Sequence, residues 1–387
     1  MRFPEFSGEW EKSTIGSLST KVGSGVTPRG GETVYKSEGH SFVRSQNVGW
    51  GHLQLDDIAF IDKETHLRQK NTELQLDDVL LNITGASIGR SALVNKQIAG
   101  GNVNQHVCII RTKDNLVPAF LCNFLLSNQG QKQIDSFQAG GNRQGLNFEQ
   151  IRSIKITIPS TKEQTKIATL LHLIDERIAT QNKIIEDLKK LKSAIIEMEY
   201  THKTKSNSHI GDFIEQTSKR NKNRAIQNVL SVSNRQGFIQ QSEQFENRSV
   251  ASDDTSNYKI VKKNDFAFNP ARINVGSIAR LTTFDRGIVS PMYICFRTKD
   301  TLFPEYLDYY FETKQFFTEI QKRLEGSVRQ CLSFEGLCNI PLCIPTIEVQ
   351  QQVGKQLSTL VQEIKLEIDF LELLQRQKKF LLHQMFI

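Results

Sequence analysis

The chain has 387 residues, enough for two or three domains with hydrophobic cores, and 38% of its residues are hydrophobic, as in ordinary globular proteins. Its formal net charge of +7 permits a polyanionic partner without establishing one. No apolar run reaches the roughly 18–20 residues of a membrane span, and the opening MRFPEFSGEW contains no apolar signal region.

The cysteine pattern predicts free thiols. No two cysteines form a CxxC pair, and no histidines lie beside them at metal-ligand spacing. We therefore expect no metal site, and the pattern is typical of a reducing cytoplasm. The six cysteines are Cys108, Cys122, Cys295, Cys331, Cys338 and Cys343.

Residues 1–160 are predicted to form a first globular domain of mixed α/β (α+β) class. Short apolar runs typical of strands alternate with glycine-rich or polar loops. Residues 120–134 have helical spacing, and Pro159 ends the last expected strand. The expected strands are at 42–43, 79–81, 107–110 and 154–158, and the loops are at 23–31, 44–47, 82–89 and 140–145.

Residues 161–202 are predicted to form one long amphipathic helix. Its apolar residues follow the 3–4 spacing of a coiled-coil seam, with polar residues at Gln181 and Lys192. At 1.5 Å per residue the helix would be roughly 50 Å long, too long for the core helix of a small domain. The seam consists of Ile167, Leu171, Ile174, Ile178, Ile185, Leu188 and Ile195.

The second half of the chain repeats the first. A shift of 187 positions carries Asn47 to Asn234 and Asn82 to Asn269, and a shift of 186 carries Pro159 to Pro345. We therefore predict a second domain at 203–346, a second helix at 347–387 and approximate internal two-fold symmetry. The second seam is the first shifted by 186 positions: Val353, Leu357, Leu360, Ile364, Leu371, Leu374 and Leu381.

The two helices are expected to pack against each other as an antiparallel pair, because an exposed apolar stripe must be buried. Even the polar interruptions of the seam are repeated, Gln181 at Glu367 and Lys192 at Lys378. The alternative is that each helix packs separately on its own domain.

The loops differ between the two halves and carry side chains suited to base recognition. Arg can bond guanine, Asn or Gln can bond adenine, and Ser or Thr can bond either base. For any single residue, a solvated loop or a phosphate contact is the competing interpretation. The basic cluster Lys219, Arg220, Lys222 and Arg224 is explained equally well by a solvated loop and by a phosphate contact. The candidates are Arg44, Gln46, Asn47, Thr84 and Arg143 in the first half and Ser233, Asn234, Arg272, Asn274 and Arg329 in the second.

Catalytic motifs are missing from the sequence. Asn269-Pro270-Ala271 is similar to the start of the Asn-Pro-Pro-aromatic loop of adenine methyltransferases, but the second proline and the aromatic residue are absent. No FxGxG-type loop for S-adenosylmethionine and no phosphate-binding glycine motif is found. We therefore predict that the chain is not an enzyme and has no cofactor of its own.

The whole chain resembles the specificity subunits of type I restriction–modification systems. The resemblance is carried by the duplicated order of several motifs: Trp10…Ile15-Gly16, Gly25-Val-Thr-Pro28, Phe42-Val-Arg-Ser-Gln-Asn47, Thr84-Gly-Ala-Ser-Ile-Gly89, Ala271-Arg-Ile-Asn-Val-Gly-Ser-Ile278, and Pro159…Glu163-Gln164 with Pro345…Gln350.

This resemblance implies two target-recognition domains held apart by the helix pair, each recognising one half of a split site in double-stranded DNA. It also implies two methyltransferase subunits carrying S-adenosylmethionine, which can recruit ATP-dependent restriction subunits. The alternatives are a coiled-coil scaffold that binds only proteins and a stand-alone DNA methyltransferase. If both domains enter one groove on one side of the duplex, the half-sites should lie about one turn apart, roughly 34–36 Å.

Overall fold

The computed structural model describes residues 2–138, 145–201, 208–234, 236–241, 254–326 and 330–386. The chain divides into two compact units. Unit 1 comprises Met1–Asn182 and Asp369–Ile387, and unit 2 comprises Lys183–Ile368. In the part of the chain that is described, no helix has the length and apolar character needed to cross a bilayer.

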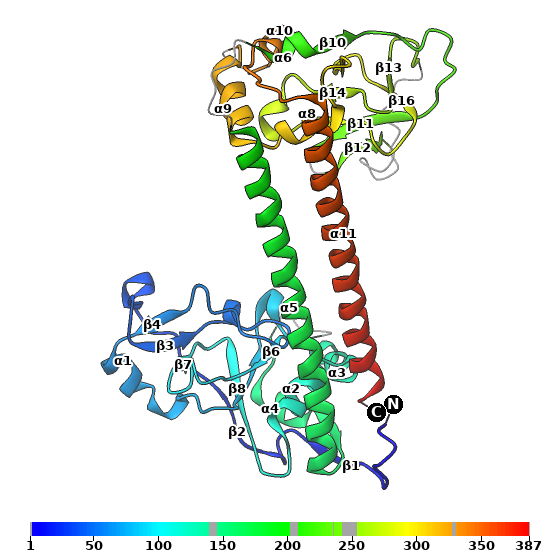
Figure 1. The fold of residues 1–387 in the computed structure, drawn as a ribbon. Helices are drawn as coiled ribbons and strands as arrows, with labels where there is room; N and C mark the ends of the chain where they lie inside the picture. Colours follow the sequence, from blue (N-terminus) through cyan, green and yellow to red (C-terminus); the bar gives the residue numbers. More distant parts are fainter. Residues whose placement is uncertain are drawn as a thin grey trace. The chain divides into compact units, whose positions relative to one another are not determined.

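Unit 1 contains a four-stranded and a three-stranded sheet with a set of short helices (Figure 1). Its strands are β1 (Glu11–Thr14), β2 (Ser19–Ser24), β3 (His40–Val43), β4 (Ala59–Ile61), β5 (Val79–Asn82), β6 (Ser91–Leu93), β7 (Asn102–Val103), β8 (Val107–Thr112) and β9 (Lys155–Ile158). Its helices are η1 (Gly31–Val34), η2 (Ser45–Asn47), α1 (Lys63–Arg68), η3 (Lys70–Thr72), η4 (Gly85–Ser87), α2 (Pro118–Leu126), α3 (Asn128–Gln138), α4 (Phe148–Ser153) and the start of α5 (Thr161–Tyr200).

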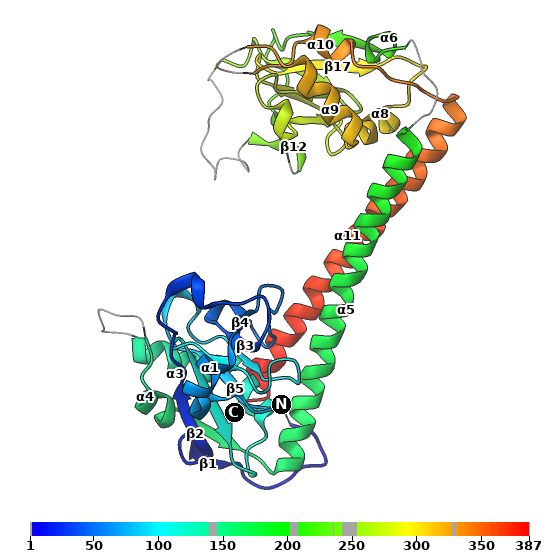
Figure 2. The same cartoon turned by 90° about the vertical axis from the view of Figure 1, so that its left-hand side faces the viewer.

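The main sheet of unit 1 has the strand order β2-β8-β5-β6 and the second sheet has the order β4-β3-β7. The two faces of β8 enter different cores. Cys108 and Ile110 pack in the larger core with α2, α3 and α5, whereas Val107 and Ile109 pack in a smaller one with β3. Helix α4 lies beside β2 (Figure 2), where the Arg152 Nη2 group donates to the Val22 carbonyl at 2.9 Å.

Unit 2 repeats this architecture. Its main sheet has the order β10-β17-β14-β15, which is the order of β2-β8-β5-β6 with the equivalent strands. Its strands are β10 (Ile214–Thr217), β11 (Val229–Ser233), β12 (Gly237–Gln240), β13 (Lys259–Lys262), β14 (Phe266–Phe268), β15 (Ile278–Arg280), β16 (Arg286–Val289) and β17 (Ile294–Thr298). Its helices are α6 (Ile210–Phe213), η5 (Ile273–Val275), α8 (Pro304–Tyr310), α9 (Lys314–Arg323), α10 (Phe334–Cys338) and α11 (Ile347–Gln384), whose end lies in unit 1.

The second sheets also correspond, with one difference. In each unit this sheet contains one parallel pair, β3 with β7 and β11 with β16. Unit 2 adds β13 on the far side of β16, giving the order β12-β11-β16-β13. The common strand orders confirm the internal repeat, and the mixed helix–sheet class predicted from the sequence is confirmed as well.

The segment predicted as one helix at 120–134 is two helices, α2 and α3. The break is at Ser127, which has an extended backbone (φ −71°, ψ 162°). Its hydroxyl donates to the Phe124 carbonyl at 2.6 Å and accepts from the Gly130 amide at 3.2 Å, so it ends one helix and caps the next. The apolar spacing continues through this serine, which is why the pattern alone predicted a single helix.

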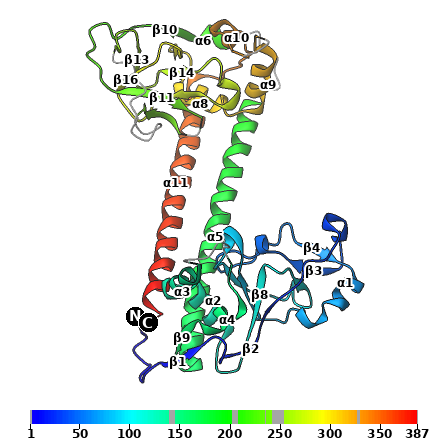
Figure 3. The same cartoon turned by 180° about the vertical axis from the view of Figure 1, so that it is seen from behind.

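The two long helices run antiparallel within each unit (Figures 1 and 3). In unit 1, Ile167 and Leu171 from the start of α5 share a core with Leu381 from the end of α11. In unit 2, Tyr200 from the end of α5 shares a core with Val353 from the start of α11. An antiparallel pairing of long helices is therefore present in both units, as predicted.

Most of the predicted seam positions are buried. These are Ile167, Leu171, Ile174, Ile185, Val353, Leu357, Leu360, Ile364, Leu374 and Leu381, whereas Ile178, Leu188, Ile195 and Leu371 are half-buried. The two lysine interruptions of the seam both have acidic partners. Lys378 pairs with Asp175 at 2.5 Å in unit 1, and Lys192 pairs with Glu312 at 2.6 Å in unit 2. Each seam lysine is thus compensated within its own unit.

A buried glutamine fixes the start of each long helix. The Gln164 side chain accepts from the Val117 amide at 2.8 Å and donates to the carbonyls of Asn115 at 3.0 Å and Pro159 at 2.9 Å. In unit 2, Gln350 makes the same three bonds, accepting from the amide of Phe303 at 2.8 Å and donating to the carbonyls of Thr301 at 3.1 Å and Pro345 at 2.9 Å. Both glutamines have 0% exposure.

The C-terminal ends of the two long helices also make equivalent contacts. The Tyr200 ring lies 4.5 Å from Tyr306 in unit 2, and the Phe386 ring lies 5.1 Å from Phe120 in unit 1. Tyr306 and Phe120 occupy equivalent places on α8 and α2. Each compact unit therefore holds the start of one long helix and the end of the other. This division into two compact units does not test the domain boundaries predicted from the sequence. Those boundaries, 1–160, 161–202, 203–346 and 347–387, stay predictions.

Candidate nucleic-acid interface

In unit 1, the first candidate loop follows β3. The Arg44 amide donates to Asn47 Oδ1 at 2.9 Å, and this bond closes the short helix η2. Asn47 Nδ2 donates to the Gln54 carbonyl at 2.9 Å and to Asp57 Oδ1 at 3.1 Å. Asn47 has 0% exposure, so in this conformation its amide holds the loop together and is not offered to a ligand.

Asp57 gathers the polar side chains of this loop. Arg44 Nη2 donates to the Asp57 carbonyl at 2.7 Å and to Asp57 Oδ2 at 3.3 Å, and Gln46 also donates to Asp57 Oδ2. The Arg44 guanidinium lies 5.5 Å from the centroid of the Tyr35 ring. Asp57 was missed by the sequence analysis, because only the folded loop brings it to Arg44. Its exposed carboxylate could accept a hydrogen bond from the amino group of cytosine.

The second candidate loop, which follows β5, is joined to the first. Asn82 Nδ2 donates to the Ser45 carbonyl at 2.8 Å, which ties the end of β5 to η2. Thr84 Oγ1 is 2.6 Å from His106 Nδ1, so His106 joins the candidate surface. Arg44, Gln46 and Thr84 are therefore brought into one loop cluster. Arg143 lies outside the described residues.

In unit 2, Ser233, Asn234 and Arg272 line one polar cavity of about 370 Å³. Ser233 ends β11, Asn234 is in the turn that follows, and Arg272 precedes η5. Arg272 is exposed, and the described residues give its side chain no hydrogen bond or ion pair. The other described lining residues are uncharged: Leu230, Ser231, Val232, Gln241, Tyr258, Asn269, Ser277, Ser290, Met292 and Tyr293.

Backbone contacts shape this cavity. Ser277 Oγ donates to the Val232 carbonyl at 3.2 Å, and the Val232 amide donates to Tyr293 Oη at 3.4 Å. Asn269 Oδ1 accepts from the Ala271 amide at 3.1 Å, so this asparagine caps its own turn. Gly276 has φ +89°, a left-handed conformation that glycine adopts readily, and it ends η5. Asn274 is half-exposed in η5 and is not among the residues that line the cavity, and Arg329 lies outside the described residues.

The two candidate surfaces occupy equivalent places in the repeat. The Leu146 amide donates to the Ile83 carbonyl at 2.8 Å in unit 1, and the Leu332 amide donates to the Pro270 carbonyl at 3.0 Å in unit 2. These bonds tie equivalent segments to equivalent loops, although the loop sequences differ. A common frame therefore presents two chemically unlike surfaces, one built around Asp57 and one around Arg272. Their contacts with DNA stay predictions.

Comparison with known proteins agrees with this architecture. Residues 7–190 match the family described as the type I restriction modification DNA specificity domain. The chain is 22% identical over 220 residues to a putative type I restriction enzyme specificity subunit, MjaX, of Methanocaldococcus jannaschii, covering 54% of this chain and 51% of the relative. It is 23% identical over 203 residues to the EcoKI specificity subunit of Escherichia coli, covering 48% of this chain and 41% of the relative.

The chain thus spans about half the length, or less, of these curated relatives. The fold is similar to the type I restriction–modification S subunit from M. genitalium, with a TM-score of 0.58, 15% identity and coverage of 100% of this chain and 99% of that one. It is also similar to the HsdS subunit from Thermoanaerobacter tengcongensis, with a TM-score of 0.50, 14% identity and coverage of 99% and 97%. Together with the duplicated motifs, these findings confirm the resemblance of this chain to the specificity subunits of type I restriction–modification systems.

Proposed function

We propose that this chain recognises a split target in double-stranded DNA and brings methyltransferase subunits to it. Each unit recognises one half of the target through its own loop cluster. The proposal rests on one observation: the two units share the same backbone framework, whereas the loops that it carries differ in sequence. The backbone ties at Ile83 and Pro270 are equivalent, whereas Arg44-Ser-Gln-Asn47 in one unit corresponds to Ser231-Val-Ser-Asn234 in the other.

Two unlike half-sites follow from two unlike surfaces. Arg272, exposed beside Ser233 and Asn234, is suited to a guanine in one half-site. In the other half-site, Arg44 and Gln46 act beside the carboxylate of Asp57. With both domains in one groove, the half-sites are separated by unread bases and lie about one turn, roughly 34–36 Å, apart.

The long helices supply surfaces for partner proteins. In unit 2, Leu191 and Met198 of α5 are spaced by two helical turns and are 50% and 69% exposed. In unit 1, Leu373 and Phe380 of α11 have the same spacing and are 59% and 53% exposed. Exposed apolar side chains in register on a helix are typical of a protein interface. We infer that methyltransferase subunits bind these helices.

The internal repeat favours two equivalent methyltransferase subunits per chain, each carrying S-adenosylmethionine, and these can recruit ATP-dependent restriction subunits. The chain itself has no catalytic role in this proposal, and it acts in the cytoplasm. Native mass spectrometry of the complex with excess methyltransferase should give two copies per chain. A stable one-to-one complex would contradict the stoichiometry.

The alternatives make different predictions. A coiled-coil scaffold would assemble with the methyltransferase without retaining DNA, whereas the proposed complex retains a duplex with its target and releases a scrambled one. A stand-alone methyltransferase would transfer methyl groups from labelled S-adenosylmethionine to DNA without any added subunit. Filter binding and methyl transfer, each measured for this chain alone and for the complex, therefore separate the three functions.

A further inference from the structure

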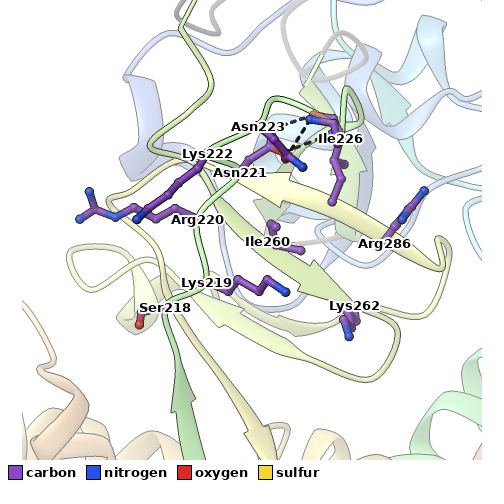
Figure 4. A pocket seen from close by; sticks show the side chains of 11 residues that line it. Ser218, Lys219, Arg220, Asn221, Lys222, Asn223, Ile226, Ile260, Lys262 and Arg286 are labelled. Atoms are coloured by element: carbon purple, nitrogen blue, oxygen red, sulfur yellow. Dashed lines mark hydrogen bonds between the residues drawn. The ribbon is translucent and has the colours of Figure 1, made fainter.

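Five basic side chains of unit 2 line an open concavity beside β13 and β16 (Figure 4). None of its described lining residues is among those of the polar cavity. The concavity has a volume of about 930 Å³. Its described lining residues include no acidic side chain. The basic residues, here named the cationic cluster, are Lys219, Arg220, Lys222, Lys262 and Arg286.

The sheet fixes the geometry of this cluster. Lys262 of β13 and Arg286 of β16 are directly paired in the antiparallel ladder, so both side chains lie on the same face of the sheet. Val261, between Ile260 and Lys262, points to the opposite face and is fully buried in the core. Figure 4 shows Ile260 in the middle of the concavity, with Lys219 extending from the loop toward Lys262.

The loop that carries the other cations is held firmly. Asn221 has 0% exposure, and its side chain donates to the Ile226 carbonyl at 2.9 Å and accepts from the Ile226 amide at 3.2 Å. The Ile260 amide donates to the Lys219 carbonyl at 2.8 Å, which attaches the loop to β13. These contacts fix the backbone of the loop that carries Lys219, Arg220 and Lys222.

The charges of the cluster are largely uncompensated. Among the described residues, Lys219, Lys222, Lys262 and Arg286 have no side-chain hydrogen bond or ion pair, and Arg220 donates only to the neutral Asn257 at 3.0 Å. Bringing like charges together without partners is unfavourable, so a surface of this kind indicates an anionic partner.

The cluster is connected to the polar cavity that contains Arg272. The Asn221 amide donates to the carbonyl of Tyr258, and Tyr258 lines that cavity. Arg286 starts β16, and Ser290 of the cavity follows the end of the same strand. At about 3.3 Å per residue, roughly 13 Å of strand separates them. A protein group in the roughly 12 Å wide major groove has backbone phosphates at a comparable distance.

At two positions of the cluster, Lys262 and Arg286, the first half of the chain has uncharged residues. The Lys262 amide donates to Asp265 Oδ2 at 2.9 Å, and at the equivalent place the Gln75 amide donates to Asp78 Oδ2 at 2.8 Å. Gln75 thus occupies the place of Lys262. The pairing of β3 with β7 and of β11 with β16 shows that the shift is 186 positions at β16, which puts Gly100 at the place of Arg286. The charges are therefore an addition to the common frame.

From this geometry we infer that the cationic cluster binds the phosphate backbone of duplex DNA beside the half-site recognised by unit 2. It supplies affinity that does not depend on sequence, whereas the cavity around Arg272 supplies sequence preference. This inference rests on the proposed function and assigns a separate role to the cluster: unit 2 carries a backbone anchor that includes Lys262 and Arg286, where the described residues of unit 1 have Gln75 and Gly100.

The test is the salt dependence of binding to a fluorescein-labelled 30-base-pair duplex of random sequence, measured by anisotropy with the full chain. Each phosphate contact contributes about 0.9 to the slope of log Kd against log salt, so a variant with Lys219→Gln, Lys262→Gln and Arg286→Gln should lose about 2.7 from the slope. The matched control removes the same charge from exposed positions on α11, by Lys355→Gln, Lys365→Gln and Lys379→Gln. The slope of the control should differ from that of the wild type by less than about 0.5, which is well below the change of about 0.9 expected for the loss of one phosphate contact.

Charge-preserving substitutions, Lys219→Arg, Lys262→Arg and Arg286→Lys, should restore the slope, which separates phosphate binding from a folding defect. An unchanged slope in the neutral variant, or an equal loss in the control, would overturn the inference. The ratio of affinities for target and scrambled duplexes should be unchanged by the neutral variant. A normal ratio with an unchanged slope would reject the anchor and leave the proposed function standing, whereas a wild-type chain without affinity for duplex DNA would reject both.

Discussion

Replacing Gln164 by Ala should loosen the junction between the first globular part and helix α5. The substitution removes the three hydrogen bonds of a side chain with 0% exposure and leaves the Val117 amide at the start of α2 without its acceptor. Each bond contributes about 0.5–1.5 kcal/mol net, and a stranded buried donor costs about 1–3 kcal/mol, so we expect a loss of about 2–4 kcal/mol. For a unit of this size, 1 kcal/mol corresponds to about 2–4 °C, so its unfolding midpoint should fall by about 4–16 °C.

The effect should be local, which gives the experiment its control. Hydrogen exchange should show lost protection at Val117 and the first turns of α5 in Gln164→Ala, and at Phe303 and the first turns of α11 in Gln350→Ala. Gln351→Ala, an exposed neighbour on α11, should change stability by less than about 0.5 kcal/mol. If both buried variants behave like this control, the glutamine does not fix the helix start and the reasoning fails.

Three further predictions concern the helix seam and the thiols. Ile364→Asp places a carboxylate at a seam position that is only 9% exposed, so folding or assembly with the methyltransferase should fail, and a soluble, fully assembled variant in gel filtration would contradict this. Lys378→Met leaves Asp175 without its partner, but the Asp175 side chain is 33% exposed, so water can still solvate its carboxylate. The cost in chemical unfolding should therefore stay at about 1 kcal/mol, and a loss above about 3 kcal/mol would contradict this. Burial raises the pKa of the Cys108 thiol to about 12, so its thiolate fraction at pH 8 is negligible. Iodoacetamide should therefore label the half-buried Cys331 and Cys343 first, and Cys108 only as the pH approaches its raised pKa or after unfolding. Rapid labelling of Cys108 in the native protein at pH 8 would refute this.

The sequence could predict those features that depend on periodicity. The 3–4 spacing of apolar side chains predicts both long helices, and the first of them contains no Gly or Pro. The shared offset of about 186 positions predicts that the two halves have the same fold. The break at Ser127 was not predictable in this way, because a serine at a helical position looks neutral until its hydroxyl caps both helices.

The candidate surfaces were predictable only in part. Polar residues after a strand indicated the loops, and three of the second-half candidates do meet in one cavity. Whether a polar side chain faces outward depends on tertiary contacts. Asn47 has a side chain suited to reading bases, but its amide group donates its hydrogen bonds to Gln54 and Asp57. Asp57 and His106 were missed for the converse reason, because their partners Arg44 and Thr84 are distant in sequence.

The central claim is that one chain recognises two unlike half-sites with two separate loop clusters. Its most direct test is methylome sequencing of cells that express the complex with wild-type chain, with Arg272→Ala or with Arg44→Ala. Loss of a base contact costs about 1–3 kcal/mol and should relax one position, so each variant should make only one half of a split motif degenerate, and the two variants should affect opposite halves. A contiguous motif, or relaxation of both halves by one substitution, would contradict the account.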